Sequence, residues 1–303
     1  MANSEHLALL KWGAIGWQDW RLHHPEIDPD LNEADLRGFD LSRLDLGRAN
    51  LRRSSLASAN LSQAVMRSAD LTRANLYEAI LIHADLIEAD LSDAHLIGTT
   101  VDGADLQGAI LRNADLREAS LIQADLSLTD LIGADLRQAN LRSADLSDAN
   151  LTRSELCRVN LNGANLTSAT LSRANAYQAE LNAVLLCKAT LYKTILVEAR
   201  LVNAILTGAT LIEAAGERSD LSWAKLSKAN LAQATFAGAN LRGADLSRAC
   251  LKEANLSGAN LRGANLTQAD LSGANLMAAN LTGANLTLTR LQNTILPDGS
   301  RHH

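Results

Sequence analysis

The side chains that could do chemistry are spread along the chain without the spacing that a reactive site needs. His83 and His95 have carboxylates near them, but the seven histidines form no metal-ligand spacing such as HExxH. Cys157, Cys187 and Cys250 fall at three different places in the repeating pattern of the chain, so they cannot share one metal ion. Enzymatic activity, a cofactor and a bound metal are therefore not expected.

The most regular set of charged residues is a series of aspartates spaced 20 residues apart. It comprises Asp85, Asp105, Asp125 and Asp145. If these side chains stack ~4.8 Å apart, neighbouring charges repel by roughly 0.9 kcal/mol even at the dielectric constant of water. Such a column could be kept for a basic partner, or nearby arginines could screen it. A third interpretation is that Asp at these positions bonds the local backbone of turns.

The element that must position these residues repeats every five residues. Leucine occupies nearly every position whose number ends in 1 or 6, from Leu31 to Leu296, and alanine usually lies two residues before it. A period of five fits neither a helix nor a strand. It fits a chain that turns a corner every five residues, with leucine and alanine directed inward and the other three residues directed outward.

The sequence Ala134-Asp135-Leu136-Arg137-Gln138 is typical of the whole array, and the A(D/N)LXX pattern resembles the pentapeptide repeat family. The resemblance implies an all-β solenoid, the right-handed quadrilateral β-helix or Rfr fold, with four repeats per coil and about 13 coils. We expect the β-helix over residues 31–296, an N-terminal capping helix and linker over 1–30, and a C-terminal tail over 297–303. The flanks are similar to those of cyanobacterial members.

The N-terminal segment has apolar residues at helical spacing: Leu7, Leu10, Ala14 and Trp17. It is predicted to form one short amphipathic helix that covers the first coil. Phe39 and Leu44 replace the usual alanine in that coil, where the helix would dock. Trp12, Trp17 and Trp20 could instead form a ligand-binding aromatic cluster.

One inward column is irregular in the second half of the chain. It reads Leu156, Ala176, Leu196, Gly216, Phe236. The ring of Phe236 could fill the space that Gly216 leaves, and we expect a bulge or kink near Gly216.

The outward positions change character near residue 150. Residues 1–150 contain 24 Asp and Glu against 13 Lys and Arg, a net charge of −11, whereas residues 151–303 contain 10 against 15, a net charge of +5. Leu185 and Ile205 occupy outward positions that should be polar. Exposed apolar residues beside charge are typical of protein interfaces.

These features favour a non-enzymatic scaffold or regulatory protein that binds another protein through its outer faces. The candidate contact residues are Asp85, Asp105, Asp125, Asp145, Leu185 and Ile205. The alternative is a DNA mimic that protects DNA gyrase, as some pentapeptide repeat proteins do. Head-to-tail self-association through the two oppositely charged halves is a further possibility. We expect no direct contact with nucleic acid or membrane, and a cytoplasmic location.

Overall fold

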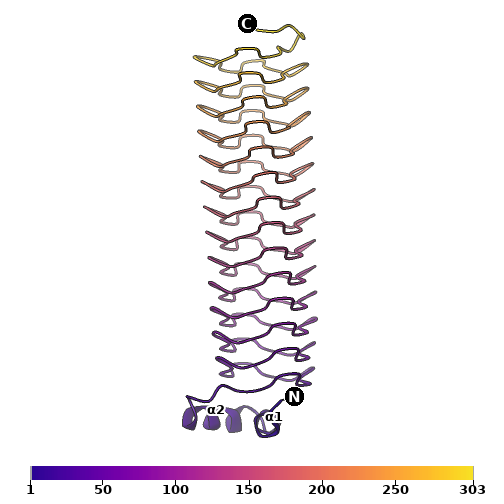
Figure 1. Cartoon of the computed structure of the whole chain (residues 1–303), viewed down its shortest axis with the longest axis vertical. Coiled ribbons are helices and arrows are strands. Elements are labelled where there is room, and N and C mark those ends of the chain that lie inside the picture. The colour runs from indigo at the N-terminus through magenta and orange to yellow at the C-terminus, as the bar shows by residue number, and fades with distance from the viewer. Residues whose placement is uncertain (1, 303) are drawn as a thin grey trace. The chain divides into compact units, whose positions relative to one another are not determined.

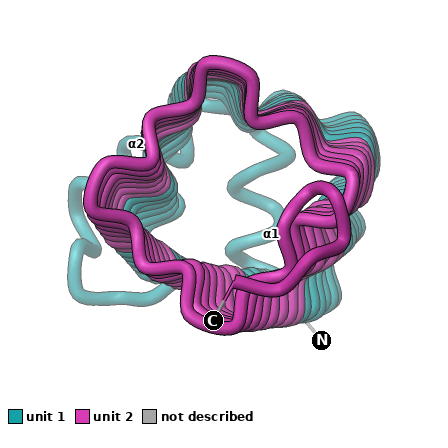
Figure 2. The backbone as a smooth tube through the Cα atoms, turned by 90° about the horizontal axis from the view of Figure 1, so that it is seen from above, with its two compact units in different colours: residues 1–150 teal, residues 151–303 magenta. Residues whose placement is uncertain are grey.

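The computed structural model describes residues 2–302, which form two compact units, Met1–Asn150 and Leu151–His303. Figure 2 colours them separately. Each unit is built from the same stacked coils and is described by itself.

Unit 1 begins with two short helices, α1 (Ser4–Lys11) and α2 (Ala14–His23), which lie against the first coil (Figure 1). The side chain of Asn3 caps α1 by accepting from the backbone N–H of Glu5 at 2.9 Å. The prediction of one helix is wrong, because Gly13 breaks it with a φ of 96°. Ala14, which a single helix would have directed inward, is exposed as a result.

Each coil consists of four β-turns joined by single residues that bridge to the next coil. In the first turn, the N–H of Ala34 donates to the carbonyl oxygen of Leu31 at 3.0 Å. Asp30 then forms a parallel bridge with Asn50, and this spacing of 20 residues is kept from bridge to bridge within unit 1. Among residues 2–302, the parallel pairing therefore consists of isolated bridges rather than extended strands.

The third residue of each turn has a left-handed backbone. Glu33 has a φ of 61°, and equivalent residues as far as Asn293 have similar values. This is the geometry of a type II turn, which requires a positive φ at its third residue. The frequent glycine at this position, for example Gly258, is explained by this requirement.

The core of each unit consists of leucine and alanine layers stacked from coil to coil. Leu111 and its equivalents are buried as far as Leu276, and so are the alanines two residues before them as far as Ala279. Each buried leucine contributes about 1.5–3 kcal/mol to stability, and only when the next coil covers it. Where Thr replaces the alanine, as at Thr99, its hydroxyl donates to the carbonyl oxygen of Leu96 at 2.6 Å.

Unit 2 has the same architecture, and its register continues through Gly216. The N–H of Gly216 donates to the carbonyl oxygen of Thr235 at 2.7 Å, and Ala215 bridges Thr235 in parallel. The expected bulge is therefore wrong. Phe236 fills the space as predicted, because a Cβ placed on Gly216 would clash with the Cδ1, Cε1 and Cζ atoms of that ring.

Candidate interaction surfaces

The predicted aspartate column exists in unit 1 as a continuous ladder. Parallel bridges join Asp85 to Asp105, Asp105 to Asp125, and Asp125 to Asp145. All four side chains are half-buried between turns. The ladder thus presents one carboxylate per coil on one outer face of the unit.

Each of these carboxylates also stabilises its own turn. Oδ1 of Asp125 accepts from the backbone N–H of Ser127 at 2.9 Å, and Oδ1 of Asp145 accepts from that of Ser147 at 2.8 Å. Asparagine makes the same bond elsewhere, as Asn165 does with the N–H of Thr167 at 3.1 Å. The turn-forming interpretation is therefore confirmed, and it accounts for an Asx residue at this position without requiring a charged one.

An arginine screens the first carboxylate of the ladder. Nε of Arg67 lies 2.5 Å from Oδ2 of Asp85. Asp105 and Asp125 form no ion pair with any residue between 2 and 302. Their second carboxylate oxygens remain available on the outer face.

Leu185 and Ile205 lie on successive coils of unit 2 and bridge one another, as the sequence predicts. Leu185 is 36% exposed, and Ile205 is half-buried. Both occupy the turn position where Asn165 accepts a backbone hydrogen bond. An aliphatic side chain cannot accept one, so the N–H groups of Cys187 and Thr207 lack the bond that the N–H of Thr167 donates to Asn165. We call this pair the apolar patch.

A second group of outward side chains in unit 2 includes a half-buried tyrosine, Tyr192, that the sequence analysis did not single out. Ile195 is 40% exposed, and Tyr192 lies in the turn just before it. The Tyr192 hydroxyl donates to Oε1 of Glu213 at 3.2 Å, and Nζ of Lys193 lies 3.1 Å from the same carboxylate. Lys193 and Glu213 are 20 residues apart, so counting by coil places them on adjacent coils, but it does not show that Tyr192 and Lys193 both contact Glu213.

The N-terminal tryptophans do not form one ligand-binding cluster. Trp17 is fully buried, and its Nε1–H donates to the carbonyl oxygen of Asp45 at 2.8 Å. Trp12 is 80% exposed. Trp17 thus supports the interpretation of the segment as a cover for the first coil. The buried guanidinium of Arg21 strengthens it by donating to the carbonyl oxygen of Ile27 at 2.7 Å and to Oδ2 of Asp45 at 3.2 Å.

The repeating units match a known sequence family. The profile of pentapeptide repeats matches in eight copies, over residues 30–67, 69–108, 109–148, 144–182, 219–258 and 254–293. The chain belongs to the pentapeptide repeat family. Its coils are accordingly those of the right-handed quadrilateral β-helix.

Solved structures of other pentapeptide repeat proteins are similar to the chain. HetL, involved in heterocyst differentiation regulation in the cyanobacterium Nostoc sp. strain PCC 7120, is 37% identical over 72% of this chain and 92% of its own, with a TM-score of 0.37. A protein from the Arabidopsis thaliana thylakoid lumen is 39% identical over 31% and 66%, with a TM-score of 0.30. QnrB1, a plasmid-mediated fluoroquinolone resistance protein, is 20% identical over 66% and 92%, with a TM-score of 0.38. The search of curated proteins gave no match.

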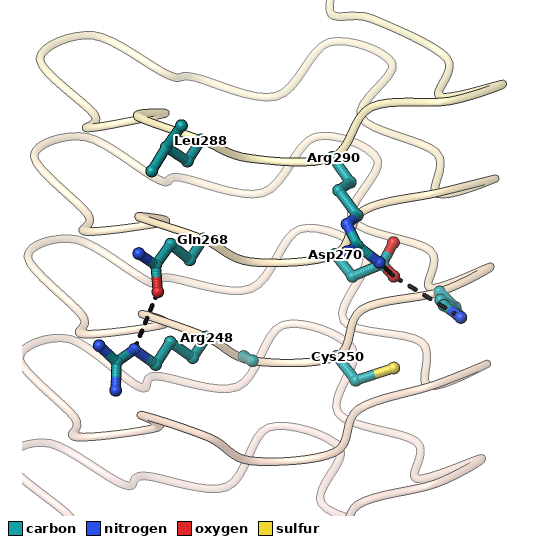
Figure 3. Close-up of a pocket in the computed structure, with 8 residues that line it drawn as sticks. Arg248, Cys250, Gln268, Asp270, Leu288 and Arg290 are labelled. Atoms are coloured by element: carbon teal, nitrogen blue, oxygen red, sulfur yellow. Dashed lines mark hydrogen bonds and ion pairs between the residues drawn. The ribbon is translucent and has the colours of Figure 1, made fainter.

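The pentapeptide repeats of unit 2 also form an open surface pocket of about 560 Å³, lined in part by Arg248, Asp270 and Arg290 (Figure 3). Within it, Oδ2 of Asp270 lies 3.6 Å from Nζ of Lys252 and 3.8 Å from Nη1 of Arg290. Partial burial opposes ionisation of Asp270, but hydrogen bonds from Ser272 and the two cations hold its pKa below the usual value.

Two further observations concern metals and membranes. In the described part of the chain, no three His, Cys, Asp or Glu residues are placed to hold a metal ion. Neither α1 nor α2 has the length or the apolar character needed to cross a membrane.

Proposed function

We infer that this pentapeptide repeat protein is a non-enzymatic scaffold or regulatory protein whose outer faces bind another protein. The observation that carries the proposal is the apolar patch. The turns at Leu185 and Ile205, on successive coils of unit 2, lack a backbone hydrogen bond that asparagine would accept and expose aliphatic surface in its place. Neither change favours the folded chain alone, because a lost hydrogen bond and exposed apolar area both cost free energy. Burial of Leu185 and Ile205 against a partner would offset that cost.

The aspartate ladder is a second contact surface in this proposal, separate from the apolar patch. Its half-buried carboxylates are held in fixed positions by their turns, so they lose little freedom when a basic surface binds. Charged contacts of this kind mainly determine the rate of association and the choice of partner, whereas burial of aliphatic side chains, as at the apolar patch, contributes mainly affinity.

The matched variant is Leu185→Asn with Ile205→Asn, which restores the asparagine that Asn165 shows to be compatible with this turn. We expect the variant to fold normally and to lose its partner. Affinity capture with wild type and variant would identify proteins that depend on the patch, and titration calorimetry with the purified protein would measure the loss. Asn285→Asp, a change between two polar residues at the equivalent position, is the control, because Asn285 bridges Asn265 rather than an acid. Equal binding by wild type and the double variant would refute the assignment.

The net charge of −11 in residues 1–150 favours a second candidate function, imitation of duplex DNA toward DNA gyrase. A gyrase supercoiling assay with added protein would test it. Protection of gyrase from a quinolone, lost in the variant Asp105→Asn with Asp125→Asn, would support the mimic over the scaffold. These substitutions keep the turn bond and remove only the charge.

A further inference from the structure

Six of the fifteen Lys and Arg of residues 151–303 lie on one outer face of unit 2. A ladder of parallel bridges runs along the middle of this face from Thr170 through Thr190 and Thr210 to Cys250. The six cations border this ladder, with Arg153, Arg173 and Lys193 on one side, where Glu213 and Glu253 follow, and Lys188, Lys228 and Arg248 on the other. We call the three threonines and the six cations the basic strip.

The chain itself neutralises little of the basic strip. Lys193 pairs with Glu213 at 3.1 Å, and Arg248 donates to Oε1 of Gln268 at 3.0 Å (Figure 3). Arg153, Arg173, Lys188 and Lys228 are exposed and form no ion pair with any residue between 2 and 302. A face that carries several unpaired cations around a row of hydroxyl groups is suited to binding a negatively charged partner.

Unit 1 carries the opposite arrangement around its aspartate ladder. Three further acids flank the four ladder residues: Glu88, Asp102 and Asp148. Two cations lie near these acids: Arg142, three residues before Asp145 in the sequence, and Arg67, which pairs with Asp85. We call the ladder and its three flanking acids the acidic strip.

The two strips have the same spacing along the coils. In unit 1 the N–H of Glu88 donates to the carbonyl oxygen of Gln107 at 3.0 Å, and in unit 2 the N–H of Lys188 donates to that of Thr207 at 3.1 Å. Both strips therefore advance by one coil of ~4.8 Å per rung. Arg153, Arg173 and Lys193 occupy three successive coils, so this border of the basic strip can lie along the aspartate ladder with its charges in register.

We propose that the partner of the acidic strip is the basic strip of a second copy of this chain. The proposal rests on the function proposed above for the aspartate ladder and names its partner. A duplex DNA backbone fits the basic strip less well, because its phosphates advance by about 3.4 Å per nucleotide on each strand and lose register with rungs of about 4.8 Å.

Exchange of charges at four turn positions would test the contact without disturbing the fold. Variant A is Glu88→Lys with Asp148→Lys, and variant B is Lys188→Glu with Lys228→Glu. All four residues are exposed and share a φ between 57° and 60°. The chain itself uses Glu, Asp and Lys there, so each substitution is compatible with the turn. Circular dichroism and thermal unfolding would verify the fold of each variant.

Sedimentation velocity at about 50 mM and about 500 mM NaCl is the measurement, because salt screens exposed charges. We expect the wild type to associate at low salt and to dissociate at high salt. Variants A and B alone should each associate roughly tenfold more weakly. An equimolar mixture of A and B should recover association, since the reversed strip of A then faces the reversed strip of B.

Three outcomes would overturn the proposal: a wild type that sediments as a monomer at both salt concentrations, variants A and B that associate as strongly as the wild type, or a mixture no stronger than either variant. A fluorescent DNA duplex that binds the wild type but not variant B would overturn it as well, and would reassign the basic strip to nucleic acid.

The variant Leu185→Asn with Ile205→Asn separates this proposal from the scaffold function. It should self-associate as the wild type does, since neither substituted side chain belongs to a strip. Loss of self-association in variants A and B alone, with capture through the apolar patch intact, assigns the strips to self-recognition. If variants A and B self-associate as the wild type does, and only the Leu185→Asn with Ile205→Asn variant loses its captured partner, the scaffold function stands and self-recognition through the strips is refuted.

Discussion

The two units have the same backbone architecture and differ mainly in their outward-facing side chains. Both stack leucine and alanine inside coils of 20 residues. Residues 1–150 carry a net charge of −11, and residues 151–303 carry +5. The comparison teaches that the inward residues determine the coil, while the outward residues are free to change sign. Perturbations of the shared core should therefore have larger effects on stability than perturbations of the outer faces.

The largest expected effect is that of Phe236→Ala in unit 2. The ring fills its own layer and the space left by Gly216, so its loss should lower the free energy of unfolding by about 3–5 kcal/mol. Leu111→Ala in unit 1 is the control for a regular layer, with an expected cost of about 3 kcal/mol. Equilibrium denaturation in guanidinium chloride would compare the two. If Phe236→Ala proved the milder change, the ring would not be filling both layers.

A smaller effect is expected when the missing leucine is restored. Gly216→Leu alone forces a side chain into the Phe236 ring and should cost about 1–3 kcal/mol. Combined with Phe236→Leu, it restores two regular layers and should recover most of that loss. The same denaturation experiment, analysed as a double-mutant cycle, measures the coupling. If the free-energy costs of Gly216→Leu and Phe236→Leu were additive, the Phe236 ring would not be filling the space at Gly216.

A third comparison separates two effects of a ladder aspartate on stability: its charge, and its hydrogen bond to the backbone of its own turn. Asp105→Ala removes the hydrogen bond to the N–H of Gln107, which is 3.1 Å long, and should cost about 1 kcal/mol. Asp105→Asn keeps that bond and removes the repulsion from Asp85 and Asp125, so it should be at least as stable as the wild type at low salt. Thermal unfolding of both variants in low and high salt would test this. A destabilised Asp105→Asn would mean that the charge itself supports the fold.

The smallest effect concerns an exposed ion pair near the start of unit 1. The Arg37 side chain donates to Asp35 at 2.7 and 2.8 Å and, with the backbone N–H of Arg37, lowers the pKa of Asp35 from 3.8 to about 2. Because the folded pKa is depressed, the stabilisation is present above about pH 4 and is lost as the pH falls toward 2.

NMR titration of the Asp35 carboxyl carbon would measure this shift, and Arg37→Ala should return the midpoint to near its ordinary value. An unchanged midpoint would contradict the assignment to Arg37. The pair is exposed, so its effect on overall stability should be slight.

The sequence predicted the parts of the fold that depend on periodicity. Leu111 and its equivalents repeat every five residues because each must fill one side of a coil, and the filling of the Gly216 space by Phe236 followed from counting by 20. The break at Gly13 was missed because glycine does not reveal its φ in the sequence. The bulge at Gly216 was a wrong prediction, since hydrogen bonds between coils hold the backbone in register even where a side chain is missing.

The candidate site was predictable only in part, for a related reason. The ladder from Asp85 to Asp145 and the contact of Leu185 with Ile205 follow from the spacing. The pairing of Tyr192 and Lys193 with Glu213 depends on side-chain length and direction, which a count of positions does not contain.

The left-handed turn residue has a consequence for how such a chain tolerates mutation. From Glu33 to Asn293 this position holds long, small, aromatic or flexible residues, yet valine, isoleucine and threonine never occur there. Branching at Cβ makes a positive φ sterically costly. A saturation library should therefore show these three residues depleted at one surface site in every five, even where the side chain touches nothing. Backbone stereochemistry therefore limits which substitutions this surface accepts, independently of any selection for partner binding.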